Sequence, residues 1–216
     1  MAAESEGEHL SAAELVSTVV TLLVAGHETT ATALAWTFDL LLHHPSVLAR
    51  LHAELATDAD DYLRAVVSES LRLRPVLPLA GRRLGSELRV GDRVLPVGTD
   101  VTPSIWLVNT RADVYPEPFA FRPERFLEDP PATYSWVPFG GGSRRCLGAA
   151  FAEFEMRVVL STVLRECSLA AGDPRPERAT RRNITLSPRH GTRVVLERRV
   201  AEVGAAPAFA AARLGD

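Results

Sequence analysis

The chain of 216 residues carries 24 basic and 27 acidic side chains, a net charge of −3, and 46% of its residues are hydrophobic. This is the composition of a globular chain with a core of its own, and the charge gives no sign of a nucleic-acid partner. Cys146 and Cys167 are the only cysteines, which excludes a disulfide framework and indicates reduced thiols in the cytoplasm.

The first ten residues, MAAESEGEHL, are acidic and polar, the opposite of the basic start of a signal peptide. We expect a flexible leader over residues 1–10. The longest uncharged apolar run, 15–26, is shorter than the roughly 18 residues that a membrane span needs. The sequence therefore predicts no membrane span and a cytoplasmic protein.

A long helix is predicted after this leader. Ser11 and Glu14 in the stretch SAAE form a capping box, and apolar residues then recur at helical spacing until Pro45. This gives one helix of about 33 residues, about 50 Å long at about 1.5 Å per residue. It is hydrophobic over most of its circumference, so we expect it to be buried at the centre of the fold.

Two shorter helices are predicted next, over 46–55 and over 61–74, and the second ends at Pro75. The hydrophobic period then changes to two. Residues 88–106 alternate and contain Gly-Asp and Pro-Val-Gly turn signals, which indicates short strands.

The second half of the chain begins with an irregular but ordered segment, 109–131, which holds five prolines and several aromatic residues. A helix is predicted over 147–165, strands near 182–187 and 193–198, and a disordered Ala/Gly-rich tail over 201–216. The predicted fold is mainly α with small β-sheets.

The stretch PFGGGSRRCLG places Cys146 just before a predicted helix. A thiolate is the reactive and metal-binding form of cysteine, and free amides at a helix start favour negative charge. The glycines at 140–142 allow backbone amides to converge on the sulfur, and Arg144 and Arg145 add positive charge. The loop is therefore predicted to hold an anion.

Other glycine-rich sites fail on their spacing. A phosphate loop ends in Gly-Lys-Ser/Thr, which is absent, and a dinucleotide fingerprint needs a third glycine where Arg145 stands. A zinc site needs further Cys or His ligands near Cys146. The alternative of an inert buried cysteine in a flexible turn is left open, although such cysteines are rarely surrounded by arginines and glycines.

The pattern Phe139-x-x-Gly142-x-Arg144-x-Cys146-x-Gly148 resembles the haem-binding loop of the cytochrome P-450 family. The resemblance implies a haem b cofactor with the Cys146 thiolate as axial ligand of its iron. It also implies that Phe139 packs beside the sulfur and the haem, that Arg144 pairs with a haem propionate, and that Gly142 and Gly148 contact the cofactor.

A second motif, AGHETT, lies within the long helix. A glycine there costs about 1 kcal/mol relative to alanine, so Gly26 indicates a groove for a flat ligand or dioxygen. The resemblance implies that Ala25 and Gly26 face the haem, and that Glu28 and Thr29 are catalytic in oxygen activation. The alternative is a threonine bonded back to its own helix. A zinc-protease motif fails because residue 31 is Ala.

The stretch ESLR places Glu69 and Arg72 on one face of the third helix. Taken alone, an exposed ion pair is the favoured interpretation. The family's Glu-x-x-Arg motif, together with Arg125 from FRPERF, implies a buried carboxylate–guanidinium network that supports the cysteine loop.

Between these motifs, Arg82 matches a second propionate-binding arginine of the family, with Arg83 as the near alternative and an exposed strand arginine as the other interpretation. The apolar stretch VLPL, 76–79, is expected to face a substrate cavity.

The resemblance covers about residues 10–200 and corresponds to the C-terminal half of a family member. It implies a long central helix, the Glu-x-x-Arg helix, the irregular segment, the cysteine loop and the following helix, which together form a partial haem domain over 11–200. The missing half would leave the long helix with a broad exposed apolar face.

Two functions follow. The first is a haem-thiolate monooxygenase that activates O₂ to oxidise a lipophilic small molecule, with electrons from a ferredoxin or an NAD(P)H-dependent reductase. The electron donor would dock near Arg144 and Arg145, and a purely solvated role for Arg145 is left open. The second is a truncated, non-catalytic fragment that cannot hold haem or turn over alone.

Overall fold

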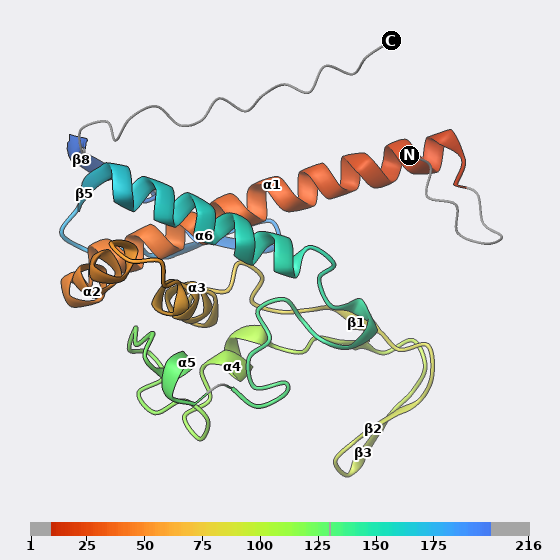
Figure 1. The fold of residues 1–216 in the computed structure, drawn as a ribbon. Helices are drawn as coiled ribbons and strands as arrows, with labels where there is room; N and C mark the ends of the chain where they lie inside the picture. Colours follow the sequence, from red (N-terminus) through yellow and green to blue (C-terminus); the bar gives the residue numbers. More distant parts are fainter. Residues whose placement is uncertain (1–9, 130, 200–216) are drawn as a thin grey trace.

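The computed structural model describes residues 10–129 and 131–199. Over these residues the chain forms six α-helices, one 3-10 turn and four two-stranded antiparallel sheets, which confirms the mainly α fold with small sheets. Figure 1 shows that the longest helix, α1, extends beyond the other described elements at its N-terminal end. The predicted tail, and the predicted leader except for Leu10, lie outside the described residues.

Helix α1, Ala12–Leu42, begins at the predicted capping box. The Glu14 N–H donates to the Ser11 hydroxyl at 3.3 Å, and the Ser11 N–H donates to the Glu14 carboxylate at 2.8 Å. Both groups would otherwise be unsatisfied amides at a helix start, so the sequence alone defines where α1 begins.

The burial of α1 differs between its two halves. Trp36, Thr37 and Leu41 are almost completely buried, whereas the apolar side chains of the first half are exposed: Leu15, Val16, Val19, Val20, Leu22, Leu23 and Val24. The prediction that α1 is buried throughout is therefore wrong for its first half, because no other described element covers it; the family resemblance implied this exposed face. Among the described helices, none is long and apolar enough to cross a membrane.

Three helices pack around the second half of α1: α2, Pro45–Leu55, α3, Asp61–Leu73, and α6, Ala149–Glu166. Their bounds agree with the predicted helices to within two residues. Apolar residues at helical spacing form one shared core, which includes Leu41, Leu51, Val66, Met156 and Leu160. This core fixes the position of α6, at whose start the cysteine loop ends.

Short strands follow α3, as predicted: β1, Arg82–Arg83, β2, Leu88–Val90, β3, Arg93–Leu95, and β4, Asp100–Val101. β2 pairs with β3 around Gly91, which has a φ of 61°, and β1 pairs with β4. The predicted strand region extends too far, because residues 105–106 begin helix α4, Ile105–Asn109. The Ser104 hydroxyl accepts the Leu107 N–H at 3.2 Å and so caps this helix.

The proline-rich segment is irregular, as predicted, apart from the single turn α5, Arg125–Glu128. The end of the described chain forms two further antiparallel pairs: β5, Cys167–Ala171, with β8, Val194–Arg199, and β6, Ala179–Arg182, with β7, Thr185–Pro188. The strand predicted at 182–187 is in fact a hairpin that turns at Asn183, which has a φ of 50°. β5 was not predicted, because it follows α6 with no turn residue between them.

The second half of α1 holds this hairpin and the chain on either side of it by hydrogen bonds between side chains and backbone. The Trp36 indole N–H donates to the Leu186 carbonyl at 3.0 Å, and the Thr192 hydroxyl donates to the Ala35 carbonyl at 3.0 Å. The buried Asp39 carboxylate accepts the Glu177 N–H, at 3.1 Å to one oxygen.

Burial raises the pKa of the Asp39 carboxyl above its ordinary value of 3.8, although the Glu177 N–H and His43 lower it. The folded chain therefore holds this proton to a higher pH than the unfolded chain does. Protonated Asp39 therefore adds to the free energy of unfolding below pH 3.8. This contribution is lost as the pH rises through the pKa that Asp39 has in the folded chain.

We expect Asp39→Asn, which keeps an oxygen for the Glu177 N–H, to remove this part of the pH dependence. The free energy of unfolding of the variant should fall less than that of the parent as the pH rises from 3.8 towards neutrality. Urea denaturation at a series of pH values measures it, and parallel profiles for the two proteins would contradict the assignment.

Candidate functional site

The cysteine loop joins the irregular segment to α6 and is closed by its own backbone. The Cys146 N–H donates to the Phe139 carbonyl at 2.9 Å, and the Arg145 N–H donates to the Gly142 carbonyl at 3.1 Å. Gly140 and Gly142 have φ values of 73° and 65°, in the left-handed region that only glycine adopts readily. The glycines are therefore needed for the path of the chain around the sulfur.

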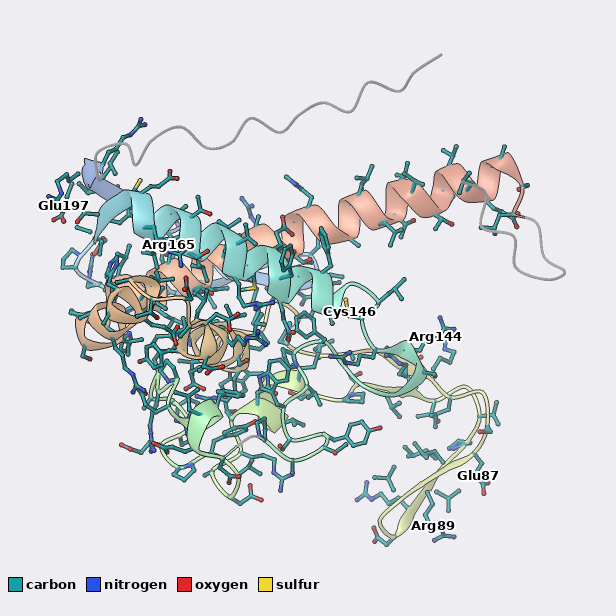
Figure 2. The ribbon with its side chains drawn as sticks, in the orientation of Figure 1. Glu87, Arg89, Arg144, Cys146, Arg165 and Glu197 are labelled. Carbon is teal, nitrogen blue, oxygen red and sulfur yellow. The ribbon has the colours of Figure 1, made fainter. Side chains whose placement is uncertain are left out.

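The Cys146 side chain is a free, exposed thiol that lies just before the first turn of α6 (Figure 2). The other cysteine, Cys167, follows the last turn of the same helix, so the two thiols lie at opposite ends of α6. The start of a helix has unpaired N–H groups and a positive dipole end, which attract a negatively charged group.

Exposed apolar side chains follow this thiol along the first turns of α6. Leu147 is 90% exposed and Phe151 is 69% exposed, and Phe154 is also exposed. Phe139 is partly buried against the core, with its ring centroid 6.1 Å from that of Trp136. This apolar patch beside a free thiol is of the kind that marks a binding surface.

Two of the predicted arginines have guanidinium groups with no carboxylate partner among the described residues. Arg144 is exposed on the cysteine loop, and Arg82 on β1 donates only to the carbonyl of the adjacent Gly81, at 2.8 Å. Arg83, the near alternative to Arg82, forms a two-bond ion pair with Asp100, at 2.8 Å for each bond. Arg82 therefore has no ion pair among the described residues, whereas Arg83 would have to leave Asp100 to bind a ligand.

The predicted substrate-facing stretch, 76–79, changes from buried to exposed along its length. Val76 is buried in the core, whereas Leu79 is exposed beside the first strands. Leu79 is therefore the most exposed apolar side chain of this stretch, and Leu77 and Pro78 are partly buried.

The AGHETT motif lies where the buried half of α1 begins. The Thr29 hydroxyl donates to the Ala25 carbonyl at 2.6 Å, which is the helix-bonded alternative for this side chain. Glu28 is exposed, and a Cβ added at Gly26 would meet no atom within 4 Å. Packing within the described chain thus does not require this glycine, and the surface beside it is open.

Glu69, Arg72 and Arg125 form a network in the interior. Arg72 donates to both Glu69 oxygens, at 2.6 and 2.8 Å, and Arg125 donates to Glu69 at 3.1 Å. Glu69 and Arg72 have no exposed surface, and Arg125 is also buried. The interpretation of an exposed ion pair is therefore wrong for this motif.

Asn109 connects this network to the cysteine loop, and sequence reasoning missed it. Its carbonyl accepts from Arg72 at 2.8 Å, and its side-chain oxygen accepts the Val137 N–H at 3.0 Å. The Val137 carbonyl in turn accepts the Gly140 N–H at 2.9 Å. An isolated asparagine at the end of a short helix carries no sequence signal for such a role.

Glu153 is a second residue that the sequence did not indicate. It lies on α6, close enough to Arg145 and Arg157 for their positive charges to act on its carboxyl. Burial raises the pKa of the Glu153 carboxyl, while the two arginines act in the opposite direction. A carboxyl thus lies on the helix that begins beside the thiol.

These residues fit a haem, the group that the motif resemblance implies. A free thiol is a ligand for iron, the apolar side chains of α6 suit a flat macrocycle, and unpaired guanidinium groups suit its carboxylates. A Cβ added at Gly26 or at Gly148 meets nothing within 4 Å, so open surface is present both on α1 and at the cysteine loop.

Comparisons with known proteins agree with this fit. A family model described as Cytochrome P450 matches residues 1–194. A curated cytochrome P450 of Mycobacterium tuberculosis (strain ATCC 25618 / H37Rv), numbered 137, is 50% identical over 188 residues, which make up 87% of this chain and 40% of that protein. The chain thus spans less than half the length of the curated relatives it matches.

Solved structures show the same relationship. The retinoic acid-bound cyanobacterial CYP120A1 superimposes with a TM-score of 0.83 at 29% identity, over 92% of this chain and 49% of that one. A six-coordinated cytochrome P450 of Thermus thermophilus gives a TM-score of 0.74 at 38% identity, over 87% of this chain and 49% of that one. The chain therefore corresponds to about half of that fold.

Proposed function

This chain belongs to the cytochrome P450 family. We propose that it supplies the cysteine ligand of a haem monooxygenase and some of the residues that assist oxygen activation. The observation that carries the proposal is the free, exposed Cys146 thiol, presented by a glycine–arginine loop at the start of α6. Haem b bound there supplies iron redox chemistry that activates O₂ to oxidise a lipophilic small molecule, with electrons from a ferredoxin or an NAD(P)H-dependent reductase.

Cys146 binds the iron as its thiolate. The backbone of the loop is fixed by the hydrogen bond from its own N–H to Phe139 and, through Asn109, by the buried Glu69 network. Leu147 and Phe151 present exposed apolar groups beside the sulfur, against which a bound haem would pack.

Arg144 and Arg82 bind the propionate carboxylates. Each has a guanidinium group without a carboxylate partner in the described part of the chain, and each is exposed on a loop or edge strand. A guanidinium binds a carboxylate with two parallel hydrogen bonds, so these residues orient the macrocycle about the Cys146 sulfur.

Glu28 and Thr29 would handle protons beside Gly26 on α1. The Thr29 hydroxyl, which donates to the Ala25 carbonyl, would rotate to hold a proton at the open surface beside Gly26. Glu28 is exposed on the same turn of α1, so a carboxyl in contact with solvent lies next to Thr29 in the chain.

Thr29→Ala should divert electrons from substrate oxidation to hydrogen peroxide in haem-loaded, electron-supplied protein. The substitution removes a proton donor while helix α1 loses only a bond to its own backbone. General acid catalysis contributes typically about 10²–10⁴-fold, so we expect product formation to fall by at least about tenfold while NAD(P)H oxidation continues. Peroxide and product per NAD(P)H are measured. Unchanged coupling would remove Thr29 from the mechanism, and Thr21→Ala, which removes a similar back-bonded hydroxyl, is the control.

The proposal is tested by loading the purified chain with haem, reducing it and adding carbon monoxide. A strongly red-shifted Soret band supports a thiolate-ligated iron. If the chain takes up no haem, the alternative of a non-catalytic fragment replaces the proposal.

A further inference from the structure

A cavity of about 260 Å³ lies away from the cysteine loop, between the end of α1 and the segment 171–193. Asp39 and His43 line it from the α1 side. Four arginines line it from the other side: Arg175, Arg178, Arg189 and Arg193. The proposed haem chemistry uses none of these residues.

The carboxylates around the cavity are already engaged. Asp173 lies 3.5 Å from Arg175 and 3.9 Å from Arg193, and Glu177 lies 3.3 Å from His190. Asp39 accepts a backbone N–H and faces His43 at 3.3 Å. These pairings leave the guanidinium groups of two lining arginines without a carboxylate in the described part of the chain.

These two arginines, Arg178 and Arg189, are exposed and occupy directly opposed positions at the open end of the β6–β7 hairpin. The Arg189 N–H donates to the Arg178 carbonyl at 2.9 Å, and the next pair along the ladder is Ala179 with Pro188. Side chains at directly opposed positions have Cβ atoms about 4.5–5.5 Å apart, and like charges there repel. An anion between the two guanidinium groups would convert this repulsion into attraction.

We propose that this cavity binds a phosphate-type dianion, either inorganic phosphate or the phosphoryl group of a small phosphomonoester. Paired guanidinium groups recognise phosphoryl oxygens with bidentate, charge-assisted hydrogen bonds. The cavity volume of about 260 Å³ accommodates a phosphoryl group with a small organic remainder. The site joins the β6–β7 hairpin to the end of α1 and is separate from the haem surface.

Isothermal titration of the full chain with inorganic phosphate, and in a second arm with glycerol phosphate, tests the site. We expect saturable binding, and the double substitution Arg178→Gln/Arg189→Gln should weaken it by at least about tenfold, because charged hydrogen bonds are lost. Tighter binding of glycerol phosphate than of phosphate assigns the site to a phosphomonoester, and equal affinity assigns it to free phosphate.

The matched control is Arg89→Gln, which removes one exposed arginine from β2 on the separate β2–β3 hairpin (Figure 2). It should leave binding unchanged. Arg178→Lys/Arg189→Lys keeps the charge and loses the planar fork, so its affinity should lie between those of the parent and the Gln variant. Non-saturable binding, equal weakening by Arg89→Gln, or the same heat from sodium chloride at matched ionic strength would each overturn the proposal.

Discussion

Cys146→Ala is expected to abolish the red-shifted Soret band of the reduced, carbon monoxide-bound haem protein. The band requires a sulfur anion on the iron, and Cys146 is the free thiol that lies at the start of α6 beside exposed apolar side chains. Alanine leaves no ligand atom there, while the Cys146 N–H bond to Phe139 is a backbone bond and is kept. The loop can therefore retain its path while the ligand is lost.

The matched control is Cys167→Ala, which removes the thiol at the other end of α6. It should leave the spectrum unchanged. If the band survives in Cys146→Ala, or disappears in Cys167→Ala, the assignment of the axial ligand is wrong.

Glu69→Gln is expected to lower the free energy of unfolding by about 3–5 kcal/mol, the usual cost of removing one partner of a buried ion pair. Glutamine keeps the shape of the side chain but leaves Arg72 and Arg125 without their shared carboxylate in the interior. One of its amide N–H groups would also face a guanidinium donor. Because domains are stable by only about 5–15 kcal/mol, the urea midpoint should fall by a large fraction.

Asp100→Asn is the control, because it breaks the Arg83–Asp100 pair, in which both side chains are exposed. No measurable change in the urea midpoint is expected. Equal effects of the two substitutions would show that burial does not determine the strength of the Glu69 network.

Local rules predicted the parts of this structure that depend on nearby residues. The capping box at Ser11 and Glu14 placed the start of α1, and the spacing of Glu69 and Arg72 placed both on one helix face. The cysteine motif was specific because it combines three features within a few residues: glycines that allow positive φ, arginines that add positive charge, and a thiol that can bind a metal.

The features that sequence reasoning missed depend on contacts between distant segments. Asn109 acts through Arg72 and Val137, and nothing in its own neighbourhood of the chain indicates either bond. The hairpin at Asn183 was predicted as one strand because the residue with positive φ is not glycine. The burial of α1 was overestimated because periodicity shows which face is apolar, but not whether a partner covers it.

The exposed first half of α1 affects how firmly the neighbouring residues Glu28 and Thr29 are held. Helices held only by local interactions are marginal in water, and fixing one backbone residue costs about 1–2 kcal/mol. Glu28 and Thr29 lie at the border between this half and the core-packed half. A partner that covers this apolar face would stabilise the first half of the helix, and through it the position of the Thr29 hydroxyl.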